Sequence, residues 1–181
     1  MRSKRGKTVK SRVRVIAGCA LAATSLIAVS AGISYAGGKD RTVYRADVMV
    51  GVSAPYTGAA NPIRGINGGG APWVIDDADI RLRESGRVDV EFEGLVIAPS
   101  VGPPNGGINP IGAMKVTVSC LSADAAGAPT TVNVSSETFQ VDRAGDAEAR
   151  VHVDLPSPCI APIVFIANGN AAGAWFAVSG A

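Results

Sequence analysis

The side chains best suited to acid–base chemistry in this sequence are one histidine and two glutamates. His152, the only histidine, lies between Val151 and Val153 in an alternating segment, so it is expected on the solvated face of a strand. A Ser-His-Asp hydrolase needs a serine on a strained elbow beside its histidine, and the sequence contains no Gly-x-Ser-x-Gly motif. We therefore expect His152 to be an exposed structural residue.

Glu91 and Glu93 have the spacing of paired catalytic carboxylates. Residues two apart on a strand lie about 7 Å apart on one face, within the range of the two carboxyl groups of a glycoside hydrolase. Arg81 and Arg83, expected on the neighbouring strand, would keep both carboxylates ionised, whereas a general acid needs a raised pKa. We expect a solvated charged face without a catalytic residue. A secreted hydrolase that uses carboxylates near Glu91 or Asp76 is the alternative.

Two acidic clusters offer oxygen ligands of the kind that calcium accepts. Neither has the glycine and the closing glutamate of an EF-hand loop at the required spacing. Aspartate is also a favoured turn residue, because its side chain bonds to nearby backbone groups. The sequence therefore predicts turns and solvated strand ends, with no metal site and no cofactor. The residues are Asp76, Asp77 and Asp79 in the first cluster, and Asp142, Asp146 and Glu148 around Gly145 in the second.

An export signal precedes all of these residues. Seven basic side chains lie within the first 14 positions, and an almost uncharged apolar stretch follows them, which is the order of a secretory signal peptide. Ser34-Tyr35-Ala36 has small residues at both recognition positions, which predicts cleavage after Ala36 and before Gly37, with Ala31 as a second candidate. The sequence thus predicts a signal peptide over 1–36 and one secreted, extracellular domain over 37–181.

The leader has two alternative interpretations. Ile16-Ala17-Gly18-Cys19 resembles a bacterial lipobox, but most of the apolar run follows the cysteine, so a lipid anchor is not expected. An uncleaved apolar run of this length could cross a bilayer as a helix. A membrane-anchored domain is therefore an alternative to secretion.

Removal of the leader changes the charge of the chain. The full sequence has a net charge of +2, but its first 36 residues hold seven of the 17 basic residues and none of the 15 acidic ones. The remaining 145 residues have a net charge of −5. This charge disfavours nucleic acid, whose binding depends on Lys and Arg, and it disfavours anionic membrane surfaces. The length suits a single domain.

Two cysteines, Cys120 and Cys159, remain after cleavage. In an oxidising exterior, two thiols in one small domain most often form a disulfide, whereas a metal site would need further Cys or His ligands at close spacing. We predict a structural Cys120–Cys159 disulfide.

Apolar and β-branched residues of the remaining chain recur mostly at period two, between clusters of Gly, Pro and Asn, which predicts strands. About nine or ten short strands without a helical stripe predict an all-β fold, an antiparallel sandwich in the immunoglobulin-like or jelly-roll style. The predicted strands cover 42–52, 73–76, 78–83, 87–97, 113–121, 131–135, 137–141, 149–155, 160–167 and 174–179.

One hairpin can be predicted with its register. A two-residue Ser85-Gly86 turn would place apolar side chains opposite charged ones along the whole ladder. A three-residue loop, Glu84-Ser85-Gly86, has glycine at the left-handed position and gives one apolar face. The opposing pairs are then Leu82 with Val88, Ile80 with Val90 and Ala78 with Phe92 on the apolar face, and Arg81 with Asp89 and Asp79 with Glu91 on the wet face.

Two Gly/Pro/Asn-rich segments, 54–72 and 98–112, lack strand periodicity. Both are longer than usual connections and are expected to be ordered functional loops or mobile ones. Neither has the Gly-Lys-Ser/Thr ending of a phosphate-binding loop.

Two features of the sequence could attach or bind carbohydrate. Asn133-Val134-Ser135 matches the short N-glycosylation sequon, which by itself carries little weight. Trp73, Trp175 and Phe176 could form a sugar-stacking platform, although aromatic rings in apolar strands more often belong to the core. Because adjacent residues on a strand point to opposite faces, one ring of the Trp175-Phe176 pair is the expected exposed binding candidate.

Several segments resemble those of small exported proteins from actinobacteria that are described only as uncharacterised. They are Ala71-Pro72-Trp73-Val74-Ile75, Glu93-Gly94-Leu95-Val96-Ile97, 155–165 and 174–177. The resemblance implies bacterial origin and export, and it brings no activity. We therefore expect an exported, non-enzymatic domain that acts through surface contact with the cell envelope, a protein or a glycan.

Overall fold

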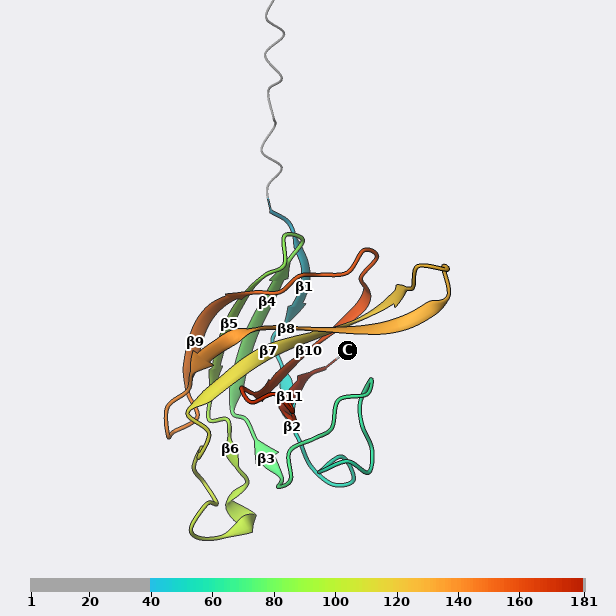
Figure 1. Ribbon diagram of the computed structural model, residues 1–181. Helices are drawn as coiled ribbons and strands as arrows, with labels where there is room; N and C mark the ends of the chain where they lie inside the picture. The colour runs from blue at the N-terminus through green and yellow to red at the C-terminus, as the bar shows by residue number, and fades with distance from the viewer. Residues whose placement is uncertain (1–39, 181) are drawn as a thin grey trace, which may run out of the picture. The chain divides into compact units, whose positions relative to one another are not determined.

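The computed structural model describes residues 40–180, and these residues form antiparallel β-structure with 11 strands (Figure 1). The predicted signal peptide, its cleavage site between Ala36 and Gly37, and the two anchor alternatives lie outside the described residues. Within 40–180 the helical structure is one short 3-10 turn, η1 (Pro99–Val101). No helix of this range is long and apolar enough to cross a membrane.

The strands form two main sheets and one small one. The four-stranded sheet has the order β1 (Thr42–Ala46), β4 (Asp77–Arg83), β5 (Arg87–Glu93) and β9 (Ala147–His152). The five-stranded sheet has the order β2 (Met49–Gly51), β11 (Trp175–Ser179), β10 (Ile160–Asn168), β7 (Ala113–Ala123) and β8 (Pro129–Gln140). The small sheet pairs β3 (Trp73–Val74) with β6 (Val96–Ile97).

The two main sheets pack around one hydrophobic core, so the prediction of an antiparallel β-sandwich is confirmed. Period-two alternation turns every second side chain inward, and burial of these apolar side chains is the main favourable term in folding. The inward side chains include Ile80, Leu82, Val88, Val90 and Phe92 from the four-stranded sheet and Val116, Val118, Val164 and Ile166 from the five-stranded sheet.

The predicted β4–β5 hairpin register is confirmed at every pair. Leu82 lies opposite Val88, and Arg81 lies opposite Asp89. Gly86 has a φ of +87° at the third loop position, where glycine carries no steric penalty. A side chain there would also meet the carbonyl oxygen of Val153.

The largest differences from the predicted strands are two divisions and one fusion, besides shifts of one to three residues at other strand ends. The segment 42–52 is broken at Asp47-Val48, and its halves join different sheets. The segment 87–97 is broken at Gly94, which has a φ of +66°. The predicted segments 131–135 and 137–141 are joined in one strand, β8, which ends at Gln140. Its register shifts opposite Val116 because two of its residues occupy the place of one. Hydrophobic alternation is lost at such a bulge while the pairing continues.

The first Gly/Pro/Asn-rich loop is ordered and covers the outer side of the five-stranded sheet. We call residues 53–69 the covering loop. Ile63 and Ile66 close a two-residue turn by exchanging backbone hydrogen bonds, with positive φ at both central residues, Arg64 and Gly65, as a type I′ turn requires. Ile66 is buried. The loop therefore acts as a partial third layer.

Hydrogen bonds hold the covering loop to the sheet. The backbone of Trp175 donates to the carbonyl oxygen of Asn67, and its own carbonyl accepts from Gly69. The Arg64 guanidinium donates to the carbonyl oxygen of Ser119 at 2.9 Å, and Asn133 donates through its side-chain amide to the carbonyl oxygen of Arg64 at 3.0 Å.

The second loop, 98–112, is organised by one buried asparagine. The side-chain amide of Asn109 donates to the carbonyl oxygen of Leu95, and its side-chain oxygen accepts from the backbone of Ile111. The backbone N–H of Asn109 donates to the carbonyl oxygen of Arg143.

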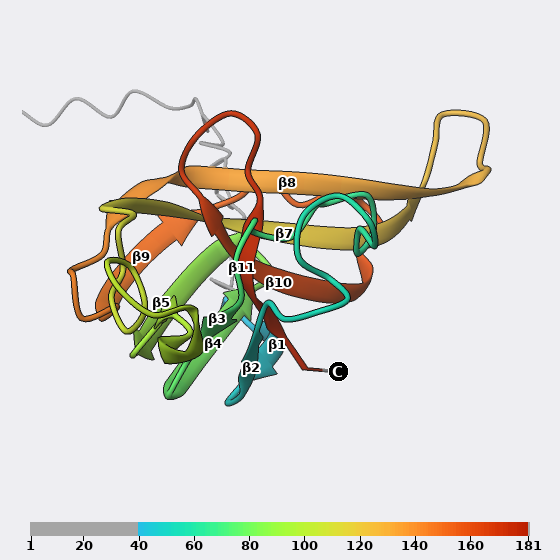
Figure 2. The ribbon, with the colours of Figure 1, turned by 90° about the horizontal axis from the view of Figure 1, so that it is seen from below.

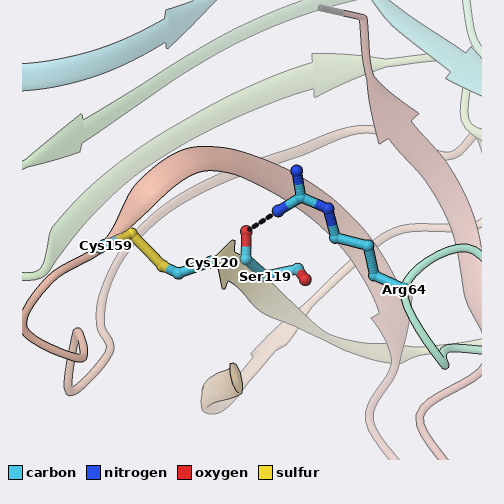
Figure 3. The surroundings of a disulfide bond; sticks show 4 residues. All are labelled: Arg64, Ser119, Cys120 and Cys159. Atoms are coloured by element: carbon cyan, nitrogen blue, oxygen red, sulfur yellow. Dashed lines mark hydrogen bonds between the residues drawn. A yellow bond between two sulfur atoms is a disulfide. The ribbon is translucent and has the colours of Figure 1, made fainter. Parts of the chain in front are cut away.

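Cys120 and Cys159 form the predicted disulfide, which joins β7 to the segment entering β10 (Figure 3). Cys120 is fully buried in the core. Arg64 reaches the neighbouring residue, Ser119, so the disulfide and the anchor of the covering loop adjoin each other (Figure 3). The bond is the state that cysteines adopt in an oxidising compartment.

Candidate functional site: the charged face of the four-stranded sheet

The outward side of the four-stranded sheet carries two kinds of cross-strand row, and we call this surface the charged face. Because β4, β5 and β9 alternate strictly, their charged residues point to solvent while the apolar ones point to the core. Arg45 of β1 lies opposite Arg81 and is exposed as well. One row, the arginine row, consists of Arg45, Arg81, Asp89 and Arg150, each opposite the next.

The neighbouring row is acidic throughout. Asp79 lies opposite Glu91, and Glu91 lies opposite Glu148, and we call these three residues the carboxylate row. Asp77 and Glu93 form a further acidic pair beyond it. The face is therefore polarised along the strands, with arginines toward the β4–β5 turn and carboxylates toward the opposite end.

Every arginine of the arginine row is paired with an aspartate. Arg45 and Arg81 both donate to the Asp79 carboxylate, at 2.9 and 3.0 Å. Arg150 donates to Asp89 at 2.7 Å. Arg81 thus lies opposite Asp89, as predicted, but it bonds to Asp79 on its own strand. Two aspartates therefore take up most of the positive charge of this face.

Asp89 is the centre of the more enclosed network. Its side chain is 23% exposed, and Arg150 binds one carboxylate oxygen while Arg83 binds the other, at 3.2 Å. The hydrogen bond from Arg150, together with that from Arg83, holds the pKa of the Asp89 carboxyl below its usual value, and partial burial opposes the shift.

Replacement of Asp89 by asparagine is expected to lower the free energy of unfolding by about 1–2 kcal/mol at neutral pH, because hydrogen bonds between ionised partners are lost. A carboxyl whose pKa is lower in the folded state stabilises above its unfolded pKa of about 3.9, and this contribution is lost as the pH falls through the folded value. The difference between wild type and D89N should therefore shrink below about pH 4. Urea unfolding at neutral and acidic pH measures it.

Asp154 provides the control for this prediction. Its side chain is fully exposed and lies 3.5 Å from His152, so D154N should change the free energy of unfolding by no more than about 0.5 kcal/mol. An equal loss in D154N and D89N would contradict a specific role for the Asp89 network.

The carboxylate row differs from the arginine row because Glu91 and Glu148 form no ion pair within the described residues. The same holds for Asp77 and Glu93. An open hollow of about 380 Å³ runs over both rows, and a second of about 320 Å³ continues over Glu91, Glu93 and Glu148. Like charges directly opposite each other destabilise a sheet. The acidic end of the face is thus available to an external cation.

His152 lies where the alternation predicts it, on the exposed side of β9, with Asp154 as its neighbour. Glu91 and Glu93 are exposed on the charged face, also as predicted. Alternation could have placed Glu91 near Asp79, because both belong to one hairpin. It could not have placed Glu148, since the pairing of β5 with β9 joins segments more than fifty residues apart.

Neither acidic cluster is arranged to hold a metal ion, and no group of three or more Asp, Glu, His or Cys side chains within 40–180 is so arranged. Asp142 accepts a hydrogen bond from the backbone of Asp146, and Asp146 accepts one from the backbone of Gly94. Asp76 is exposed, and Asp79 bonds to arginines. The carboxylates of Asp142 and Asp146 thus bond to backbone groups.

The expectation of an exposed aromatic ring is wrong. Trp73, Trp175 and Phe176 are 4%, 2% and 4% exposed. Trp73 and Phe176 stack with ring centroids 4.2 Å apart. Residues 67–69 of the covering loop pair with the backbone of Trp175 as a parallel bridge, and the ring of Phe165 lies 6.0 Å from the Trp175 ring. A loop without periodicity gives no sequence signal for what it covers, so alternation alone left one ring in solvent.

The sequon residue Asn133 lies in the middle of β8, and its side-chain amide donates a hydrogen bond to the carbonyl oxygen of Arg64.

Comparison with protein-family models, curated proteins and solved structures finds no match for this chain. The resemblance to small exported actinobacterial proteins stays a prediction.

Proposed function

We propose that the protein is an exported, non-enzymatic binding domain whose charged face contacts a basic segment of another protein. The observation that carries the proposal is the carboxylate row, in which Glu91 and Glu148 face each other and form no ion pair within residues 40–180. Opposed carboxylates lower the stability of the sheet, and a positively charged ligand that binds them would relieve this repulsion. The sequence-predicted leader and the disulfide support export.

The shape of the charged face favours a protein partner over a small molecule. Small-molecule sites are enclosed and mostly apolar, whereas the hollows here are open and lined by charged side chains of β4, β5 and β9. The polarity of the face adds specificity, because a basic segment would be attracted by the carboxylates and repelled by Arg83 and Arg150 at the other end.

Binding of a short oligolysine peptide, measured by titration calorimetry, tests this function. We expect binding at low salt that weakens as salt is raised. The variant E91Q should weaken it about threefold to tenfold. E137Q changes the net charge equally on β8 of the other sheet, and should leave the affinity nearly unchanged. Absence of binding at low salt, or an equal effect of both variants, would refute the proposal.

A carboxylate-dependent hydrolase is the second candidate, favoured by the direct opposition of Glu91 and Glu148. Side chains directly opposite on paired strands have Cβ atoms about 5 Å apart, and retaining glycosidases hold their carboxyl groups at a similar separation. The open surface and the buried aromatic rings give a sugar no walls and no stacking platform. Hydrolysis of glycosides that is lost in folded E91Q would establish this candidate in place of the first.

A further inference from the structure

The four edge strands of the two main sheets differ in how they are protected. An edge strand presents unpaired N–H and C=O groups, and proteins protect such edges with short strands or charged side chains. β2 has three residues, β1 has five with one arginine, and β9 has six with Glu148, Arg150 and His152. β8 has twelve residues with a single charge, Glu137.

β8 also has one unpaired edge, although the covering loop contacts its outward side at Asn133. Within the described residues it pairs only with β7, and none of its twelve residues is buried. The β7–β8 hairpin extends past the other strands, with its turn far from the body of the sandwich (Figures 1 and 2). The stretch from Pro129 to Ser136 contains no charged residue. It has the features of an edge that pairs with another strand.

The backbone groups that point away from β7 can be identified. Asp124 donates its N–H to the carbonyl oxygen of Ala128 at the hairpin turn, so this pair is a hydrogen-bonded one. Because hydrogen-bonded and non-hydrogen-bonded pairs alternate in an antiparallel ladder, Thr130, Val132 and Val134 face β7. Thr131, Asn133 and Ser135 direct their N–H and C=O groups to the free edge.

We propose that two copies of this protein associate through antiparallel pairing of their β8 edges, centred on Asn133. In this register Thr131 of one copy lies opposite Ser135 of the other, and Asn133 lies opposite itself. About six backbone hydrogen bonds form, because each such pair exchanges two. A shift by two residues toward the turn would oppose Ser135 with Pro129, which has no N–H, and the opposite shift would bring in Glu137.

The side chains are self-complementary in this register. Val132 of one copy lies opposite Val134 of the other on the inward side, and both are half-buried in a single chain. Thr131 and Ser135 meet on the outward side, where the Ser135 hydroxyl is hydrogen-bonded to that of Thr117 within each chain at 2.8 Å, and Thr–Ser pairs stabilise opposed strands. The two-fold arrangement uses both long edges, and the remaining edges are short or charged, so association ends at two copies.

Light scattering during size-exclusion chromatography of the purified protein, over about a hundredfold range of concentration, tests the proposal. We expect a mass that rises from one copy to two. T131K/S135K places lysine opposite lysine and should raise the dissociation constant at least about tenfold. T131K/S135E replaces the same two residues but places lysine opposite glutamate, so it should remain dimeric.

Circular dichroism and the thermal midpoint of each variant show whether it is folded. A single-copy mass of the unmodified protein at every concentration overturns the proposal, and so does a dimer that T131K/S135K leaves intact. Equal dissociation of both variants contradicts the pairing of Thr131 with Ser135. Species larger than a dimer contradict the closed two-fold arrangement.

Discussion

Replacement of both disulfide cysteines by alanine, C120A/C159A, is expected to lower the free energy of unfolding by about 4 kcal/mol. The bond closes a loop of 39 residues, and it therefore removes a large part of the conformational entropy of the unfolded chain. For a domain of this size the loss corresponds to a decrease in thermal midpoint of about 10–20 °C. Differential scanning calorimetry of the oxidised protein and the variant measures it.

Reduced wild-type protein separates the effect of the bond from that of the sulfur atoms. Cys120 is fully buried in the hydrophobic core, so alanine there leaves a small cavity, whereas the reduced protein keeps both sulfur atoms and lacks only the bond. Most of the loss should therefore appear in the reduced protein as well. A loss below about 1 kcal/mol in the reduced protein would show that the bond contributes little.

Local pairing could be predicted from this sequence, and distant pairing could not. The β4–β5 register follows from alternation and from Gly86, because the loop that joins the two strands is short enough for one arrangement to bury every apolar side chain. The opposition of Glu91 and Glu148 depends on β9, which no local rule attaches to β5. The part of the candidate site on β4 and β5 could therefore be predicted from the sequence, and the part on β9 could not.

The bulge in β8 and the loop that covers the five-stranded sheet explain where the predicted strands and exposed residues differ from the structure. The extra residue opposite Val116 interrupts the alternation of β8, so one long edge strand was interpreted as two short ones. The proposed dimer edge could not be recognised from strands of five residues. The disulfide, by contrast, needed no geometry, because two thiols in an oxidising compartment have few alternatives.

The covering loop is expected to be essential for stability, although its sequence has no strand or helix pattern, and Phe165 tests this. Phe165 lies opposite Thr117 on the outer side of the five-stranded sheet, where a sandwich residue would usually face solvent, yet it is 0% exposed. Its ring lies 6.0 Å from that of Trp175. F165A should lower the free energy of unfolding by about 3–5 kcal/mol, because it leaves a cavity beneath the loop.

Val50 is the matched control, because it belongs to the same cross-strand row, in which Val178 lies between it and Phe165. The covering loop does not shield it, and it is 55% exposed, so V50A should cost less than about 0.5 kcal/mol. Tryptophan fluorescence adds a local readout, since a loosened loop in folded F165A would expose Trp175 and shift its emission to longer wavelength. Similar losses in both variants would mean that the loop contributes no more than an ordinary surface segment.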